Sequence, residues 1–160
     1  MRGAQAGSAS DLEALFRAYW PRSFRAAYLV VHDAAAAEDT AQEAFLAAIR
    51  SLDRFDRRRP FGPWLHRIVV NRAIDWARAR TLRAEAELDE FAAARDASGG
   101  FDDEVLAGLH ALTPEHRAVI VLRHLLEYTP GEIAELLDLP RGTVNSRLRR
   151  GLDELGETLS

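Results

Sequence analysis

A run of hydroxyl and guanidinium side chains in the last quarter of the chain has the chemistry of a DNA-contacting surface. Thr143, Ser146 and Arg150 recur at helical spacing, and Arg147 and Arg149 lie beside them. No acidic residue occurs from 141 to 150. Guanidinium groups bind phosphates or guanine edges, and small hydroxyl residues allow a close approach to the duplex. The alternative is an ordinary solvated helix face, which an isolated run of arginines would favour.

The residues around this run predict two short helices across a tight turn. Thr129 is placed to cap the first helix, Pro130 suits its first position, and Glu132 completes a capping box. Residues 138–140, Asp-Leu-Pro, end that helix. The second helix then carries an apolar face that we expect to be buried: Val144, Leu148, Leu152 and Leu155. A helix-turn-helix favours DNA recognition over a plain solvated face.

A second constellation mixes aromatic rings with arginines. Phe55 and Arg58 lie in a basic loop, and Trp64, Arg67 and Asn71 follow at helical spacing. Unpaired bases stack on aromatic rings, amides bond base edges, and arginines follow the phosphates, so this set suits single-stranded nucleic acid. Burial in a core is the alternative for Trp64, because aromatics at helical spacing usually pack inside.

A third constellation lies on the helix expected from Asp33 to about residue 52. One apolar stripe, which includes Ala41 and Phe45, suits the core. A separate stripe of Asp39, Gln42, Glu43 and Leu46 suits a protein partner with basic helices, since charges orient the partner and leucine adds affinity. A solvated face with one stray leucine explains the same pattern.

The charges are segregated along the chain, although the formal net charge is only −4. Residues 54–80 contain eight arginines and two acidic residues, whereas residues 81–104 contain two arginines and eight acidic residues. Local charge governs phosphate contact, so the acidic average does not exclude a nucleic-acid binder.

Every periodic segment is helical, which predicts an all-α chain of two small helical domains joined by an acidic flexible linker. The first domain is expected at 8–83, with a capping box at Ser10 and Glu13, a break or kink at Pro21, and a helix from Gly62-Pro63 to about residue 80. Residues 84–103 form the linker, and 104–160 form the second domain, restarting at the Thr113-Pro114 cap.

Several function classes lack their signatures in this sequence. The five histidines show no metal-ligand spacing, cysteine is absent, and no zinc-protease, phosphate-loop or nucleophile-elbow motif occurs. We therefore expect no enzyme, no metal and no cofactor. No apolar run approaches bilayer length and no signal peptide is visible, so the chain is expected in the cytoplasm, without membrane insertion.

Three motifs in order resemble the extracytoplasmic-function sigma factors, the compact class of the sigma-70 superfamily. Residues 37–46 (AEDTAQEAFL) are similar to the polymerase-binding helix, 61–71 (FGPWLHRIVVN) to the promoter-melting helix, and 139–148 (LPRGTVNSRL) to the upstream-element recognition helix. The resemblance implies a transcription initiation factor that binds core RNA polymerase, recognises both promoter elements and promotes promoter opening.

The same resemblance implies roles for residues. Asp39, Gln42, Glu43 and Leu46 would face the clamp helices of the largest polymerase subunit, and the second domain would meet the flap of the second-largest. Phe55 and Asn71, with Arg58, Trp64 and Arg67 around them, would receive a flipped base of the minus-ten element. An anti-sigma factor is a further expected partner. The minus-thirty-five element would be met by Arg141, Thr143, Asn145, Ser146, Arg147, Arg149 and Arg150.

The sequence departs from the family pattern at three of its positions. Asn145 replaces a frequent basic residue, Arg141 a frequent small apolar one, and Glu127 the usual glycine before the first helix of the motif. The alternative function is a stand-alone helix-turn-helix regulator whose first domain senses a ligand or dimerises. That alternative leaves the aromatic and arginine block unexplained.

Overall fold

The computed structural model describes residues 1–87 and 102–159, and these residues are all helix and loop. The N-terminal half contains α1 (Arg2–Gln5), α2 (Ala9–Val31), α3 (Ala34–Arg50), the 3-10 turn η1 (Leu52–Arg54) and α4 (Phe61–Glu87). The C-terminal half contains α5 (Asp103–Ala111), α6 (Pro114–Ile120), the π-helical η2 (Val121–Leu125), α7 (Pro130–Leu137) and α8 (Arg141–Leu159). The all-α class with two helical units is confirmed.

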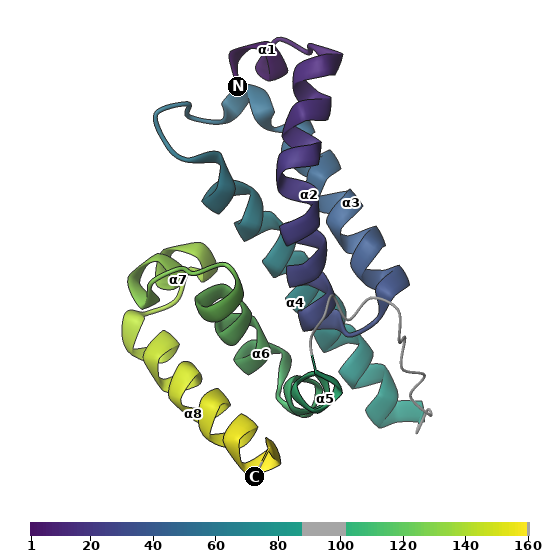
Figure 1. The fold of residues 1–160 in the computed structure, drawn as a ribbon, viewed down its shortest axis with the longest axis vertical. Coiled ribbons are helices and arrows are strands. Elements are labelled where there is room, and N and C mark those ends of the chain that lie inside the picture. Colours follow the sequence, from purple (N-terminus) through teal and green to yellow (C-terminus); the bar gives the residue numbers. More distant parts are fainter. Residues whose placement is uncertain (88–101, 160) are drawn as a thin grey trace.

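Helices α2, α3 and α4 pack side by side as a bundle, with α1 at one end of α2 (Figure 1). Their facing sides are lined by small and branched apolar residues, and Ala41, Leu65 and Val69 are completely buried. Small alanines on α3 let the helices approach closely, while the larger side chains of α4 fill the space between them. The apolar stripe predicted on α3 is therefore a core stripe.

The C-terminal half is a smaller group of helices that lies along α4 (Figure 1). Its helices begin where the sequence predicts, because Thr113 caps α6 and Thr129 caps α7 with the complete capping box to Glu132. Asp138 ends α7 in the left-handed conformation at φ 54°. Val144 and Leu148 of α8 are buried against this half, whereas Leu152 is 44% exposed. The prediction of a fully buried apolar face on α8 is therefore wrong at Leu152.

The two halves make direct polar contacts. The Tyr128 hydroxyl lies 2.6 Å from His66 Nδ1, and both side chains are buried. Arg117, which is 5% exposed, donates from Nη1 to the carbonyl oxygen of Val30 at 2.5 Å. Burial lowers the pKa of Tyr128's partner His66 to about 4, with Arg22 adding to the effect, so this histidine is neutral near pH 7.

Two more contacts extend the same interface. Arg78 of α4 forms an ion pair with Glu115 of α6. The rings of His32 and His110 stack across the halves with centroids 4.6 Å apart. Burial lowers the pKa of His110 to about 4, with further contributions from His32 and nearby arginines. Uncharged imidazoles are needed here, because a charged pair at this spacing would repel.

The N-terminal end differs from the prediction in two respects. Ser8, not Ser10, caps α2 by accepting from the Asp11 amide, and Ser10 lies inside the helix. Pro21 does not start a new helix, because α2 continues through it from Ala9 to Val31. The exposed position of Pro21 lets the helix tolerate the missing N–H, since the freed carbonyl can meet water.

The bounds of the linker also shift. Helix α4 continues to Glu87, four residues into the segment predicted as linker, and α5 begins at Asp103 with Asp102 as its cap. The rest of that predicted segment, residues 88–101, lies outside the described residues.

Candidate nucleic-acid interface

A cavity of about 530 Å³ opens at the N-terminal end of α4, beside the basic loop (residues 55–60). It is lined by three residues predicted to contact single-stranded DNA: Phe55, Trp64 and Arg67. Sequence reasoning did not single out the other lining residues from this half, although they belong to the arginine-rich segment 54–80, which pointed to this region. They are Arg54, Asp56, Arg59, Pro60 and Pro63.

The aromatic wall of the cavity is a packed cluster. Phe55 is only 7% exposed, with its ring centroid 5.0 Å from Trp64 and 5.5 Å from Phe61. Because these neighbours cover most of Phe55, only a small part of its ring is open to a ligand. Trp64 is half-buried and keeps more of its surface available for stacking.

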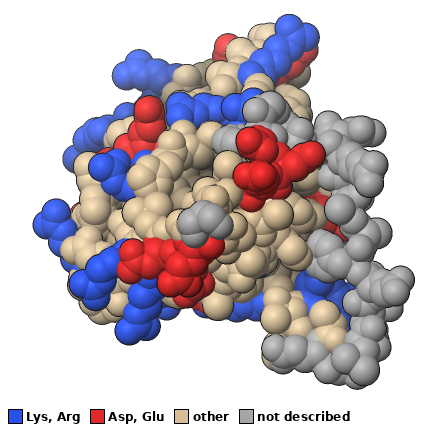
Figure 2. All heavy atoms as spheres, turned by 60° about the horizontal axis from the view of Figure 1, so that its bottom comes forward, with Lys and Arg blue, Asp and Glu red and all other residues tan. Residues whose placement is uncertain are grey.

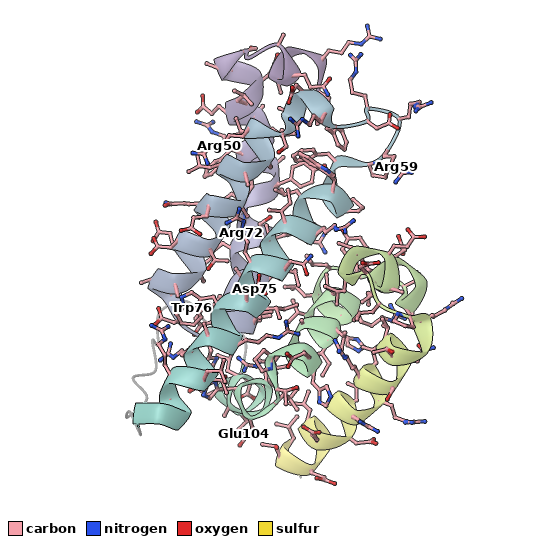
Figure 3. All side chains as sticks on the ribbon, turned by 180° about the vertical axis from the view of Figure 1, so that it is seen from behind. Arg50, Arg59, Arg72, Asp75, Trp76 and Glu104 are labelled. Carbon is pink, nitrogen blue, oxygen red and sulfur yellow. The ribbon has the colours of Figure 1, made fainter. Side chains whose placement is uncertain are left out.

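Arginines surround this wall. Arg54, Arg59 and Arg67 are exposed and line the cavity, and Figure 3 shows Arg59 on the loop that precedes α4. Arg58 is also exposed but does not line the cavity, and its guanidinium donates to both carboxylate oxygens of Asp56 at 3.0 and 3.1 Å. These bonds lower the pKa of the Asp56 carboxyl, and the Asp56 carboxylate offsets the positive charge of Arg58.

Asn71 lies one helical turn beyond Arg67 on α4. Its Nδ2 donates to the Arg67 carbonyl oxygen at 2.8 Å, and Asn71 is not among the residues that line the cavity. The structure therefore brings Phe55, Trp64 and Arg67 together but leaves Asn71 outside the cavity wall. Its Oδ1 and the second Nδ2 hydrogen remain available for a base edge. The predicted contact of Asn71 with a base stays a prediction.

The C-terminal half completes the cavity with three residues of α7: Glu132, Glu135 and Leu136. Sequence reasoning missed them because their position depends on how the two halves pack. Helix α7 thus adds two carboxylates to a wall whose other side carries arginines. A phosphate that enters the cavity would be attracted by one side and repelled by the other.

The proposed recognition helix α8 follows α7 after a short turn. Arg141, Asn145, Arg149 and Arg150 are exposed, whereas Thr143, Ser146 and Arg147 are half-buried. The carbonyl oxygen of Pro140 accepts from the amides of Thr143 and Val144 at 3.0 and 3.2 Å, which fixes the first turn of α8. All seven predicted residues therefore lie on one helix, and none of them is fully buried.

The proposed polymerase surface lies on α3. Asp39, Gln42 and Glu43 are exposed, and Leu46 is 51% exposed. Glu43 lies 3.7 Å from Arg72 of α4, so one of its carboxylate oxygens is shared with that arginine. Sequence reasoning missed Ile49, one turn beyond Leu46, which is 44% exposed and extends the apolar part of this surface.

Positive and negative side chains are mixed on the face of the molecule shown in Figure 2. Figure 2 shows arginine and acidic side chains interspersed over the end of the molecule that includes the lower part of Figure 1. No single-sign patch covers that face outside the grey region. At the cavity, the local positive charge comes from Arg54, Arg59 and Arg67, and local charge governs phosphate contact.

Within residues 1–87 and 102–159, no group of three or more His, Asp or Glu side chains is placed to hold a metal ion. In the same part of the chain, no helix has the length and apolar character needed to cross a bilayer.

Comparison with known proteins gives matches to both halves. The Sigma-70 region 2 family matches residues 15–83, and the Sigma-70, region 4 family matches residues 102–155. The ECF RNA polymerase sigma factor SigW of Bacillus subtilis is 32% identical over 160 aligned residues, covering 88% of this chain and 84% of that protein.

Two solved structures have a similar fold. The sigma factor RpoE in complex with the anti-sigma factor NepR from Bartonella quintana matches with a TM-score of 0.78 at 22% identity, covering 94% of this chain and 98% of that one. CnrH in complex with the cytosolic domain of CnrY matches with a TM-score of 0.73 at 26% identity, covering 99% and 93%.

Proposed function

Because the chain belongs to the extracytoplasmic-function sigma factors, which are transcription initiation factors of the sigma-70 family, we propose a division of labour between its halves. Residues 8–83 bind core RNA polymerase and recognise and melt the minus-ten element, and residues 104–160 recognise the minus-thirty-five element. The observation that carries this proposal is one chain with both an arginine-flanked aromatic cavity and a capped helix-turn-helix.

The polymerase contact is assigned to α3. Asp39, Gln42, Glu43 and Leu46 are exposed on a helix whose opposite side is the bundle core. An exposed leucine surrounded by carboxylates fits the basic clamp helices of the largest polymerase subunit, because the leucine is desolvated on binding while the charges set the orientation. The C-terminal half is proposed to contact the flap of the second-largest subunit.

The minus-ten contact is assigned to the cavity beside the basic loop. A flipped base would stack on the exposed part of Trp64 next to Phe55, and Arg59 and Arg67 would bind the flanking phosphates. Asn71 would bond the edge of a neighbouring base from outside the cavity. Arg58 would contribute charge from the loop after exchanging Asp56 for a phosphate.

The minus-thirty-five contact is assigned to α8. Exposed Arg141, Arg149 and Arg150 suit phosphates, and the half-buried hydroxyls of Thr143 and Ser146 suit a close approach to base edges. Asn145 and Arg147 are the candidates for base reading. Because of the departure at Asn145, the preferred upstream sequence is not transferred from relatives that carry a basic residue there.

An anti-sigma factor is a proposed partner, because two of the solved relatives are complexes of a sigma factor with such a protein or with the cytosolic domain of its partner. As a partner of bacterial RNA polymerase, the chain is proposed to act in the cytoplasm and to catalyse no reaction of its own. The stand-alone regulator does not account for the Sigma-70 region 2 match across residues 15–83.

Run-off transcription with purified core polymerase tests the proposal. The promoters carry substitutions in the minus-ten and the minus-thirty-five elements separately, and the chain is also assayed for duplex binding without polymerase. We expect initiation that requires the chain and responds to both elements, with weak duplex binding by the chain alone. Tight sequence-specific binding without polymerase, and no initiation with it, would support the regulator instead.

A further inference from the structure

The basic loop must hold its shape to present Phe55 and Arg59 to DNA. Its own backbone supplies few bonds for this purpose. The Phe55 amide donates to the Leu52 carbonyl oxygen at 3.1 Å, and the Arg59 amide donates to the Asp56 carbonyl oxygen at 3.0 Å. The Phe55 carbonyl has no partner within these turns, although it lies at the junction between η1 and the loop.

A side chain from the start of the chain reaches this junction. The side-chain amide of Gln5 makes two hydrogen bonds there. Its Nε2 donates to the Leu52 carbonyl oxygen at 2.9 Å and to the Phe55 carbonyl oxygen at 3.0 Å. One NH₂ group thereby uses both of its hydrogens on two carbonyls three residues apart. Gln5 and the loop are separated by about 50 residues in sequence.

Gln5 is itself held in place by the packing of α1. Ala4 is 4% exposed, and the amides of Gly7 and Ser8 donate to the carbonyl oxygens of Ala4 and Gly3 at 3.1 and 2.9 Å. Gly7 has φ 86°, a conformation that favours glycine, and it reverses the chain between α1 and α2. Figure 1 shows α1 at the end of the bundle where η1 leads into the loop.

We propose that Gln5 is a positioning residue for minus-ten recognition, fixing the backbone at Phe55 so that the aromatic wall and Arg59 meet the DNA in one geometry. The inference rests on the proposed role of the cavity. It adds a residue that lies outside the Sigma-70 region 2 match at 15–83. Without the Gln5 amide, the Phe55 carbonyl loses its donor and the Leu52 carbonyl keeps only the Phe55 amide, so the loop gains alternative conformations.

The test uses holoenzyme assembled from core polymerase and the full chain carrying Gln5→Glu or Gln5→Ala. Glutamate keeps the size of glutamine but places an acceptor against two carbonyls. We expect open-complex formation on the preferred promoter to fall about fivefold or more, as for the loss of one to two hydrogen bonds. The preference among minus-ten variants should flatten, while the preference among minus-thirty-five variants should stay unchanged.

Arg2→Ala is the matched control, because Arg2 is exposed on the same short helix. It should behave like the wild type. Hydrogen exchange of the free chain provides a second measurement that does not depend on polymerase, and amides of residues 55–59 should exchange faster in Gln5→Glu than in Arg2→Ala. If the wild-type chain shows a minus-ten preference, and the Gln5 variants show the same preference and the same hydrogen exchange as the wild type, the inference about Gln5 is wrong while the proposed function stands. A wild-type chain without any minus-ten preference would instead overturn the proposed function.

Discussion

Acidification is expected to destabilise the N-terminal half through His66. The imidazole is 6% exposed, and burial lowers its pKa from 6.5 to about 4. Below about pH 6.5 the unfolded chain takes up a proton at this residue, whereas the folded chain does not until about pH 4. The free energy of unfolding therefore falls as the pH drops through this window.

The size of the effect follows from the shift. Each pH unit in the window costs about 1.4 kcal/mol, so lowering the pH from about 7.5 to about 5 removes about 2 kcal/mol of stability through His66. His66→Asn keeps a polar atom near the Nδ1 position that faces Tyr128 but removes the titrating group. The variant should lose about 2 kcal/mol less than the wild type over the same pH change.

Urea unfolding at both pH values measures this difference. All three tryptophans, Trp20, Trp64 and Trp76, belong to α2 and α4, so their fluorescence reports the half that contains His66. Acid effects at His32 and His110 occur in both proteins and cancel in the comparison. His124→Asn, at an exposed position, is the matched control and should retain the wild-type loss. Equal losses in His66→Asn and the wild type, within about 0.5 kcal/mol, would refute the reasoning.

The remaining predictions concern two surfaces and one backbone position. Asp39→Arg with Glu43→Arg should abolish holoenzyme formation, because both carboxylates are exposed on α3, while the melting temperature stays nearly unchanged; a pull-down with core polymerase decides it, and retained binding argues against the α3 assignment. If Arg147 reads a base, Arg147→Ala should lower the discrimination between bases at one upstream position by about 1–3 kcal/mol of binding free energy. Arg150→Ala should instead weaken the binding of all promoters alike and reduce the slope of log affinity against log salt concentration by about 1. Affinities of holoenzyme for substituted promoters at several salt concentrations separate the two, and the reverse pattern would exchange their roles. Glu127→Gly should stabilise the chain by up to about 1 kcal/mol in thermal or urea unfolding, because Glu127 has φ 62°, where a side chain is strained; Glu127→Ala should give no such gain.

Local signals in the sequence were sufficient for much of the helix-turn-helix. The capping box of Thr129 and Glu132 depends on residues three apart, and both of its hydrogen bonds form as predicted. The buried stripe of α3 follows from helical periodicity in the same way. The family's usual glycine at the position of Glu127 also has a physical reason, because the backbone there has φ 62°, in the left-handed region that favours glycine.

Contacts between distant segments could not be predicted from those signals. The amide of Gln5 meets the loop only because α1 folds back along α2, and Glu132 reaches the cavity only because the halves pack together. At Pro21 a local rule favoured a break or a kink, but α2 continues through this residue as one helix from Ala9 to Val31. Asn71 was correctly placed on the helix of Trp64 and on nearly the same face, but it lies about two turns further along the axis of α4 and so falls outside the cavity.

Because α7 forms part of the cavity wall, ligand binding in the cavity is linked to the movement of α7 away from the N-terminal half. Any ligand that fits the cavity only after α7 has moved away selects the fraction of molecules in which Glu132, Glu135 and Leu136 are displaced. Its apparent dissociation constant is the intrinsic one divided by that fraction, so a fraction of about one in a hundred weakens binding about a hundredfold. A partner that binds only the separated halves recovers the same factor, because linkage between binding equilibria is reciprocal.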